Sequence, residues 1–195
     1  AYSVVCRLPA GPVDTSDAWE PPQLTPGQPV EGEEVLLDCN ELAEGTDFFA
    51  LGGASVTLDG RYLAYLTDTV GDERYNLYLR DLVTGEHLPE VITNIAPGAE
   101  WSNDGTYLFY QRVDEAWRPD SVWRHRRGTD PAEDVRIFHE PDERYWVGMG
   151  FTRDEQYFTI AVSSKITTEL WFLDAATPAG DFQCVRPREE GVEYG

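Results

Sequence analysis

Short runs in which apolar and polar residues alternate make up most of the chain. The segments Arg61–Leu66 and Tyr75–Arg80 place tyrosines and leucines in the two-residue rhythm of a β-strand. Asp81–Glu86 follows the second run as a tight turn, in which Gly85 can adopt a positive φ. Apart from a helical turn expected near Asn40–Ala43, no long segment keeps a period of 3.6 residues. The pattern therefore predicts an all-β fold.

A turn followed by a strand recurs at intervals of roughly 45–50 residues. The turn residues Asp59-Gly60, Asp104-Gly105 and Asp154-Glu155 precede the runs Arg61–Leu66, Thr106–Tyr110 and Gln156–Val162. The strand that follows this run in each unit is expected at Asn76–Arg80, Ser121–His125 and Glu169–Leu173. The strand that closes each unit is expected at His87–Ile92, Asp134–Phe138 and Phe182–Val185. A four-stranded unit of this length, with a turn signal before its second strand, is typical of a β-propeller blade.

We predict a partial β-propeller with about three four-stranded blades, at residues 48–96, 97–147 and 148–188. Residues 1–47 are interpreted as an incomplete earlier blade with strands at Tyr2–Leu8 and Glu34–Asp38. These strands are joined by an exposed, acidic, Pro- and Gly-rich loop at Pro9–Gly32, and residues 189–195 begin the next connection. Because propellers close with about four to eight blades, we expect the chain to be a fragment whose native start precedes Ala1. A closed assembly of several copies is the alternative.

The formal net charge is −21, from 36 acidic residues against 15 Lys and Arg residues. Such a chain is not expected to bind nucleic acid or an anionic membrane surface. Two explanations of the charge stay open, an acidic surface that favours solubility and a field that attracts basic peptides. No run approaches the ~18 consecutive apolar residues of a membrane-spanning helix. The sparse cysteines, Cys6, Cys39 and Cys184, favour packed thiols in a reducing compartment over a disulfide framework.

The run Tyr65–Tyr75, with Asp81–Glu86 behind it, closely resembles the oligopeptidase B (protease II) group of the prolyl oligopeptidase family of serine peptidases. Further stretches resemble the same group in the same order along nearly the whole chain, most weakly in Pro9–Gly32. These stretches are Trp101–Gly105, Arg118–His125, Gly128-Thr129, Asp142–Tyr145 and Pro187–Tyr194. The ordered set is specific, whereas the turn-plus-strand motif alone is shared by many propellers.

The resemblance implies a cytoplasmic two-domain enzyme that cleaves short peptides after Arg or Lys. A seven-bladed propeller would cap a C-terminal α/β-hydrolase domain, and this chain would be roughly the first half of that cap. The chain holds no G-x-S-x-G nucleophile elbow, and its histidines His87, His125 and His139 fall in or beside expected strands. No His and Cys approach the spacing of zinc ligands. We therefore expect no catalytic residue, cofactor or metal here, and no peptidase activity from these residues alone.

Charged residues on such a cap can form interdomain ion pairs that set the balance between open and closed enzyme. By resemblance, Asp47, Glu73 and Arg74 occupy positions where family members place charges facing the hydrolase domain, and we select them as gating candidates. Some relatives carry two basic residues in place of Glu73-Arg74. The alternative is a solvated hairpin in which Glu73 and Arg74 pair locally. A protein of another class also stays open, a non-catalytic propeller that serves as an interaction scaffold.

Four tryptophans recur near strands in successive units. We expect them to pack between blades rather than to stack on nucleic-acid bases. These residues are Trp101, Trp123, Trp146 and Trp171. The terminal blades would expose apolar faces and strand edges that further blades cover. The isolated chain is therefore expected to self-associate.

Overall fold

The computed structural model describes residues 1–8, 25, 27–28 and 30–195. The chain divides into two compact units, Ala1–Thr46 and Asp47–Gly195. Most of the loop expected at Pro9–Gly32 lies outside the described residues. Each unit has its own secondary structure and is described separately below.

The first unit contains a two-stranded antiparallel sheet followed by one turn of helix. Strand β1 (Val4–Arg7) pairs with β2 (Glu34–Asp38), and α1 (Cys39–Leu42) begins directly after β2. The helix starts there because the carboxylate of Asp38 accepts a hydrogen bond from the amide of Asn40 at 2.8 Å. Both strands and the helical turn lie where the sequence predicts them.

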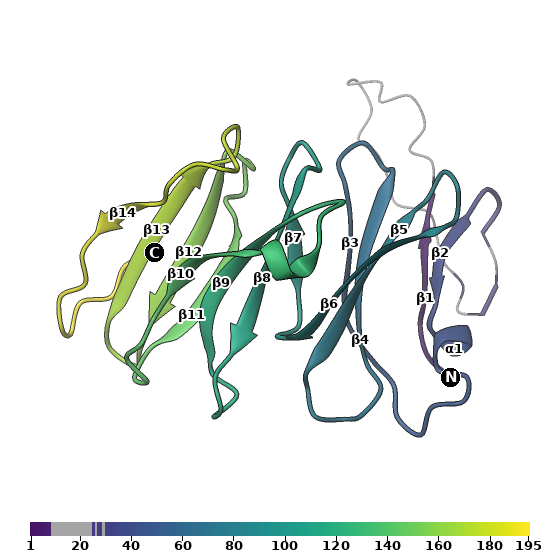
Figure 1. Ribbon diagram of the computed structural model, residues 1–195, viewed down its shortest axis with the longest axis horizontal. Coiled ribbons are helices and arrows are strands. Elements are labelled where there is room, and N and C mark those ends of the chain that lie inside the picture. Colours follow the sequence, from purple (N-terminus) through teal and green to yellow (C-terminus); the bar gives the residue numbers. More distant parts are fainter. Residues whose placement is uncertain (9–24, 26, 29) are drawn as a thin grey trace. The chain divides into compact units, whose positions relative to one another are not determined.

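The second unit consists of three four-stranded antiparallel sheets, and in each the strands follow one another in chain order (Figure 1). The first sheet comprises β3 (Ala50–Val56), β4 (Tyr62–Asp68), β5 (Tyr75–Asp81) and β6 (His87–Ile95). The second comprises β7 (Ala99–Trp101), β8 (Tyr107–Val113), β9 (Pro119–Arg126) and β10 (Val135–His139), with a 3₁₀ turn, η1 (Pro131–Glu133), before β10. The third comprises β11 (Trp146–Phe151), β12 (Tyr157–Ser163), β13 (Thr168–Asp174) and β14 (Gln183–Arg186). The predicted all-β architecture is confirmed.

The second sheet is covered on both faces because alternate residues of its strands enter two different cores. On β8, Leu108 and Tyr110 pack with residues of β4, β5 and β6 in one buried cluster. Phe109, between them, packs with Phe158, Ile160 and other residues of the third sheet in a second cluster. The rings of Phe109 and Phe158 stack with centroids 4.2 Å apart. The two-residue period of a strand thus places one side chain in each interface.

Three of the four recurrent tryptophans lie in these cores, as expected. Trp101 is buried in the first cluster, and Trp123 packs against that cluster. Trp171 packs against the second cluster. The expectation is wrong for Trp146, which is 55% exposed. Trp146 pairs with Ser163 at the end of β11, on the face of the third sheet turned away from the second cluster.

The repeated Asp-containing turns close by local hydrogen bonds. In the first, the Thr57 hydroxyl donates to the Asp59 carboxylate at 2.5 Å, and that carboxylate accepts the amide of Arg61 at 3.0 Å. The corresponding bonds recur in the second and third sheets. The residue after each aspartate has a positive φ, which favours glycine. These residues are Gly60, Gly105 and Glu155.

Successive connections of an antiparallel meander alternate between the two ends of the sheet. We call the end with the Asp-containing turns the turn end and the opposite end the hairpin end. The turn end carries residues 57–61, 82–86, 102–106, 127–134, 152–156 and 175–182. The hairpin end carries residues 47–49, 69–74, 96–98, 114–118, 140–145, 164–167 and 187–190.

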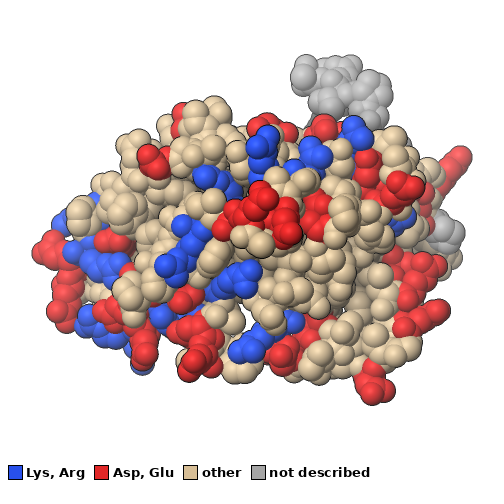
Figure 2. All heavy atoms as spheres, in the orientation of Figure 1, with Lys and Arg blue, Asp and Glu red and all other residues tan. Residues whose placement is uncertain are grey.

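The acidic side chains do not form a single patch on the face drawn in Figure 2. Asp and Glu are spread over that face, and Lys and Arg are interspersed among them. On this face the acidic residues are distributed as a general acidic surface rather than gathered into one site for a cation.

Candidate interdomain site at the hairpin end

The structure brings the three gating candidates to the hairpin end of the first sheet. Asp47 and Glu73 are exposed, and Arg74 is half-buried. Asp47 lies three residues before β3, whose first residue pairs with Asp68 at the end of β4. The ring of the next residue, Phe48, lies against Gly71 in the loop that holds the other two candidates. Residues that are far apart in sequence therefore share one edge of this sheet.

The carboxylate of Asp68 organises the loop between β4 and β5. It is almost fully buried and accepts the amides of Val70 and Gly71 at 2.8 Å and of Glu73 at 2.9 Å. Burial alone would raise the pKa of Asp68, but these amides offset the burial and hold that pKa below its usual value. Glu73 has a φ of 61°, a conformation supported by the hydrogen bond that its backbone amide donates to the Asp68 carboxylate. The loop is a defined structure and not only a flexible hairpin.

Arg74 contacts the neighbouring sheet. Its guanidinium lies over the ring of Trp117, 4.3 Å from the ring centroid. Trp117 belongs to the loop between β8 and β9. The indole Nε1 of Trp117 donates to the carbonyl oxygen of Asp72 at 2.7 Å. We call these contacts among Asp72, Arg74 and Trp117 the Trp117 clasp. No ion pair between Glu73 and Arg74 is present among the described residues, so the local pairing considered above is replaced by a cation–π contact.

A buried arginine supports the loop that carries Trp117. The side chain of Arg118 is 7% exposed and donates to the Asp114 carboxylate at 2.9 Å. It also donates to the carbonyl oxygens of Tyr145 at 2.7 Å and Glu140 at 3.2 Å. The second hairpin is thus fixed to the connection that leads into the third sheet.

Three of the segments that carry the family resemblance meet at this hairpin end. Arg188 forms ion pairs with Glu140 and with Glu169, the latter at 3.3 Å, and its guanidinium lies 4.2 Å from the centroid of the Tyr145 ring. The side chains of Glu140 and Glu169 are 5% and 9% exposed. Arg118, Tyr145 and Arg188 come from three separate motifs of the sequence. Their shared role here is structural, because they join the second sheet, the third sheet and residues 187–190.

The histidines do not form a site that a substrate could reach. His125 is completely buried, with its Nδ1 2.7 Å from Asp134, and the Tyr110 hydroxyl donates to the same carboxylate at 2.9 Å. This network lies between the first and second sheets, and sequence spacing alone did not reveal it. His87 and His139 are exposed on the outer strands β6 and β10.

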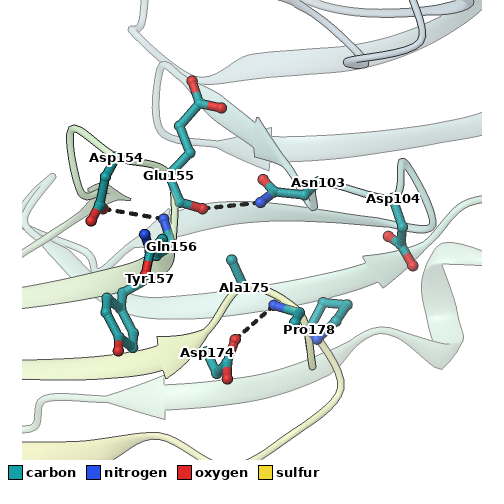
Figure 3. Close-up of a pocket in the computed structure, with 10 residues that line it drawn as sticks. Asn103, Asp104, Asp154, Glu155, Gln156, Tyr157, Asp174, Ala175 and Pro178 are labelled. Carbon is teal, nitrogen blue, oxygen red and sulfur yellow. Dashed lines mark hydrogen bonds between the residues drawn. The ribbon is translucent and has the colours of Figure 1, made fainter.

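A pocket of about 580 Å³ lies at the turn end between the second and third sheets. Its lining includes the carboxylates of Asp104, Asp154, Glu155 and Asp174 (Figure 3). Figure 3 shows that these carboxylates point away from one another. Asp104 and Asp154 are already engaged by the turns that they close. The arrangement therefore lacks the convergence that a cation site needs.

In the described part of the chain, no group of three or more His, Cys, Asp or Glu residues is arranged to hold a metal ion. Nor does any described helix have the length and hydropathy needed to cross a bilayer. Cys6, Cys39 and Cys184 are all free thiols.

Comparison with known proteins identifies the family to which this fold belongs. The profile of the prolyl oligopeptidase N-terminal β-propeller domain matches residues 1–195. The chain belongs to the prolyl oligopeptidase family. Its three complete sheets are therefore blades of the family's propeller.

Relatives within the prolyl oligopeptidase family include named peptidases. The chain is 40% identical to dipeptidyl aminopeptidase BI of Pseudoxanthomonas mexicana over 84% of its length and 22% of that protein's. It is 38% identical to protease 2 of Moraxella lacunata over 83% of its length and 24% of that protein's. Oligopeptidase B from Trypanosoma brucei, solved in a closed form with covalently bound antipain, superposes with a TM-score of 0.82. That match has 31% identity and covers 100% of this chain and 25% of the solved one. The chain thus spans about a quarter of the length of these relatives.

Replacing Trp117 with alanine is expected to loosen the first hairpin of this prolyl oligopeptidase blade. The change removes the cation–π partner of Arg74 and the donor to the Asp72 carbonyl, each worth roughly 1 kcal/mol. Hydrogen exchange of the amides in residues 69–74 should accelerate roughly tenfold or more. As a control, Leu58→Ala also removes an exposed apolar side chain, but at the turn end of the same sheet. Equal exchange rates in the two variants would show that the clasp does not hold the loop.

Proposed function

We propose that the chain is part of the gating cap of a serine peptidase that hydrolyses short peptides after Arg or Lys. Family membership and the resemblance to oligopeptidase B support this proposal. The nucleophile, its base and the oxyanion hole would lie in an α/β-hydrolase domain elsewhere in the same polypeptide. Residues 1–195 alone would then lack peptidase activity and would act by restricting access and by closing over the active site. The free thiols are compatible with a cytoplasmic location, which is also part of the proposal.

One observation supports the gating role: the candidate charges share the hairpin end of the first blade, and Glu73 and Arg74 lie on a loop that is fixed in place. Asp68 and the Trp117 clasp hold the backbone of this loop, while the carboxylates of Asp47 and Glu73 remain exposed. A preorganised charge loses little conformational entropy when it meets an opposite charge on a second domain. The hairpin end is therefore the surface that would face the hydrolase domain. Arg74 would act partly by positioning the loop, because its guanidinium is shared with Trp117.

Charge reversal of Glu73 tests the gating role. In the full-length polypeptide, Glu73→Lys should lower kcat/KM for a short Arg-containing peptide about tenfold, because a well-placed interdomain pair contributes about 1–2 kcal/mol. Solution scattering should show a larger open fraction, and the difference from wild type should shrink at high salt. Glu86→Lys is the matched control, because it makes the same charge change on an exposed residue at the turn end of the same sheet. If the two variants have the same kcat/KM and the same open fraction, Glu73 does not gate the enzyme.

The other candidate is a non-catalytic propeller that serves as an interaction scaffold. The sequence downstream of Gly195 separates the two functions. A G-x-S-x-G elbow after further blades supports the peptidase, whereas a stop codon after further repeats supports the scaffold. Attraction of basic peptides by the acidic surface would be a separate contribution. It predicts a steep salt dependence of kcat/KM for dibasic substrates, and a flat dependence would contradict it.

A further inference from the structure

A second, more apolar pocket opens at the hairpin end of the third blade. Its volume is about 310 Å³. It is lined by Arg144, Tyr145, the four-residue loop 164–167 and Glu190. Tyr145 is buried there, and the guanidinium of Arg188 packs on its ring. Ile166, in the loop between β12 and β13, is 56% exposed. The pocket thus combines a fixed aromatic ring with an apolar side chain that has not been removed from water.

The pocket also contains an unusual charge. Lys165 is the only lysine in the chain, and the other 14 of its 15 Lys and Arg residues are arginines. Arg144, across the pocket, is already paired with Asp142 at 2.7 Å. Lys165 is exposed, and no carboxylate of the described residues lies within ion-pair distance of it. In a chain with a net charge of −21, an acidic partner would be repelled over most of the surface. It could approach where a free ammonium group and an exposed apolar residue lie side by side.

We propose that this pocket is the docking site for an acidic and apolar segment of the same polypeptide outside residues 1–195. An apolar side chain would enter beside Ile166 and Tyr145, and an adjacent carboxylate would pair with Lys165. The proposal rests on the proposed function, because it gives the second domain a further contact on the surface that carries Glu73. Relatives are about four times as long as this chain, which leaves ample polypeptide to supply the segment. A second copy of the chain is the alternative occupant, and the isotope-mixing control described below distinguishes the two.

The uniqueness of Lys165 provides a direct test. Treatment of the full-length protein with a zero-length carbodiimide reagent joins an amine to a neighbouring carboxylate through an amide bond. Any side-chain amine cross-linked from within residues 1–195 must be that of Lys165. Mass spectrometry is expected to find Lys165 joined to an Asp or Glu outside these residues, next to an apolar residue. Lys165→Arg should abolish the cross-link while it keeps the charge. A cross-link only to Glu190 or to another residue of this chain would overturn the proposal.

The origin of the cross-link and its functional weight need separate controls. In a mixture of isotopically light and heavy protein, docking within one polypeptide gives no mixed species, whereas a mixed species would show that a second copy occupies the pocket. Lys165→Glu should lower kcat/KM about three- to tenfold, and Arg153→Glu, an exposed residue at the turn end, should leave it unchanged. Equal losses in both variants would count against docking. The cross-link does not depend on Glu73, so it can form even if Glu73→Lys shows that the gating role is wrong.

Discussion

Replacing Arg188 with methionine is expected to lower the free energy of unfolding by about 3 kcal/mol, because removing one partner of a buried ion pair leaves its charge uncompensated. Here two carboxylates lose their partner. The side chains of Glu140 and Glu169 are 5% and 9% exposed, and Arg188 is 29% exposed between them. Methionine keeps much of the aliphatic stem but provides no donor. Urea denaturation of the purified protein at neutral pH measures the change.

Arg186 provides a matched control two residues away. Its guanidinium pairs with Glu189 at 2.9 Å, but both side chains are more than half exposed, at 56% and 66%. An exposed pair contributes about 0–1 kcal/mol, so Arg186→Met should change stability little. Similar losses in the two variants would mean that the Arg188 network does not join the blades as the structure indicates.

The pH dependence gives a second readout of the Arg188 network. Burial alone would raise the pKa of Glu169, but hydrogen bonds from Arg188 and Trp171 offset it, and the pKa lies below its usual value. A carboxyl group of this kind contributes stability above its unfolded pKa, and the contribution is lost as the pH falls through the lower folded pKa. The difference between wild type and Arg188→Met should therefore be full above about pH 5 and shrink below about pH 4. A constant difference across this range would exclude Glu169 as its source.

The second large effect is expected in the oligomeric state of the isolated chain. The outer face of the third sheet carries Trp146, 55% exposed, Tyr157, 39% exposed, and the half-buried Phe172. Leu173 and Trp171, on either side of Phe172, point to the opposite face and its core. Trp146 and Tyr157 lie toward opposite ends of this face, with Phe172 between them, and exposed aromatic area of this kind favours association. Residues 1–195 should therefore form dimers or larger species as concentration rises, as measured by light scattering.

Phe172→Glu should shift this equilibrium toward the monomer. The substitution places a charge in the centre of the aromatic face, where the Phe172 ring now packs edge-on to Tyr157 with centroids 5.5 Å apart. Val83→Glu serves as the control, because Val83 is a single exposed valine at the turn end of another sheet, 77% exposed. A wild-type chain that stays monomeric at high concentration would contradict the prediction. So would an equal response of the two variants.

Some parts of the fold follow from local sequence and others do not. The second, third and fourth strands of each sheet lie within a few residues of their predicted positions, because alternation is a local property of a strand. The first strand of the first sheet is obscured by Gly52 and Gly53. A Cβ atom at Gly52 would lie 2.4 Å from the Tyr75 ring, so glycine is required there by a side chain of β5, two strands away in the sheet. Only the paired sheet reveals that requirement.

Some features of the candidate site also follow from local sequence, and others depend on tertiary packing. Sequence resemblance selected Glu73 and Arg74, and the hydrogen bonds that shape their loop come from residues nearby in sequence. The clasp to Trp117 and the network around Arg188 depend on blades placed side by side, and no periodicity encodes those contacts. The same is true of the buried pair of His125 and Asp134.

The sequence by itself determined the class of fold, the positions of most strands, the closing turns and the family resemblance, because each of these depends on short-range periodicity or on ordered motifs. The tertiary structure alone decided which residues meet. It placed Arg74 on Trp117, exposed Trp146, joined the separated motifs through Arg118 and Arg188, and left Lys165 beside an open apolar pocket. These outcomes depend on the packing of one sheet against the next, which is a long-range property of the chain.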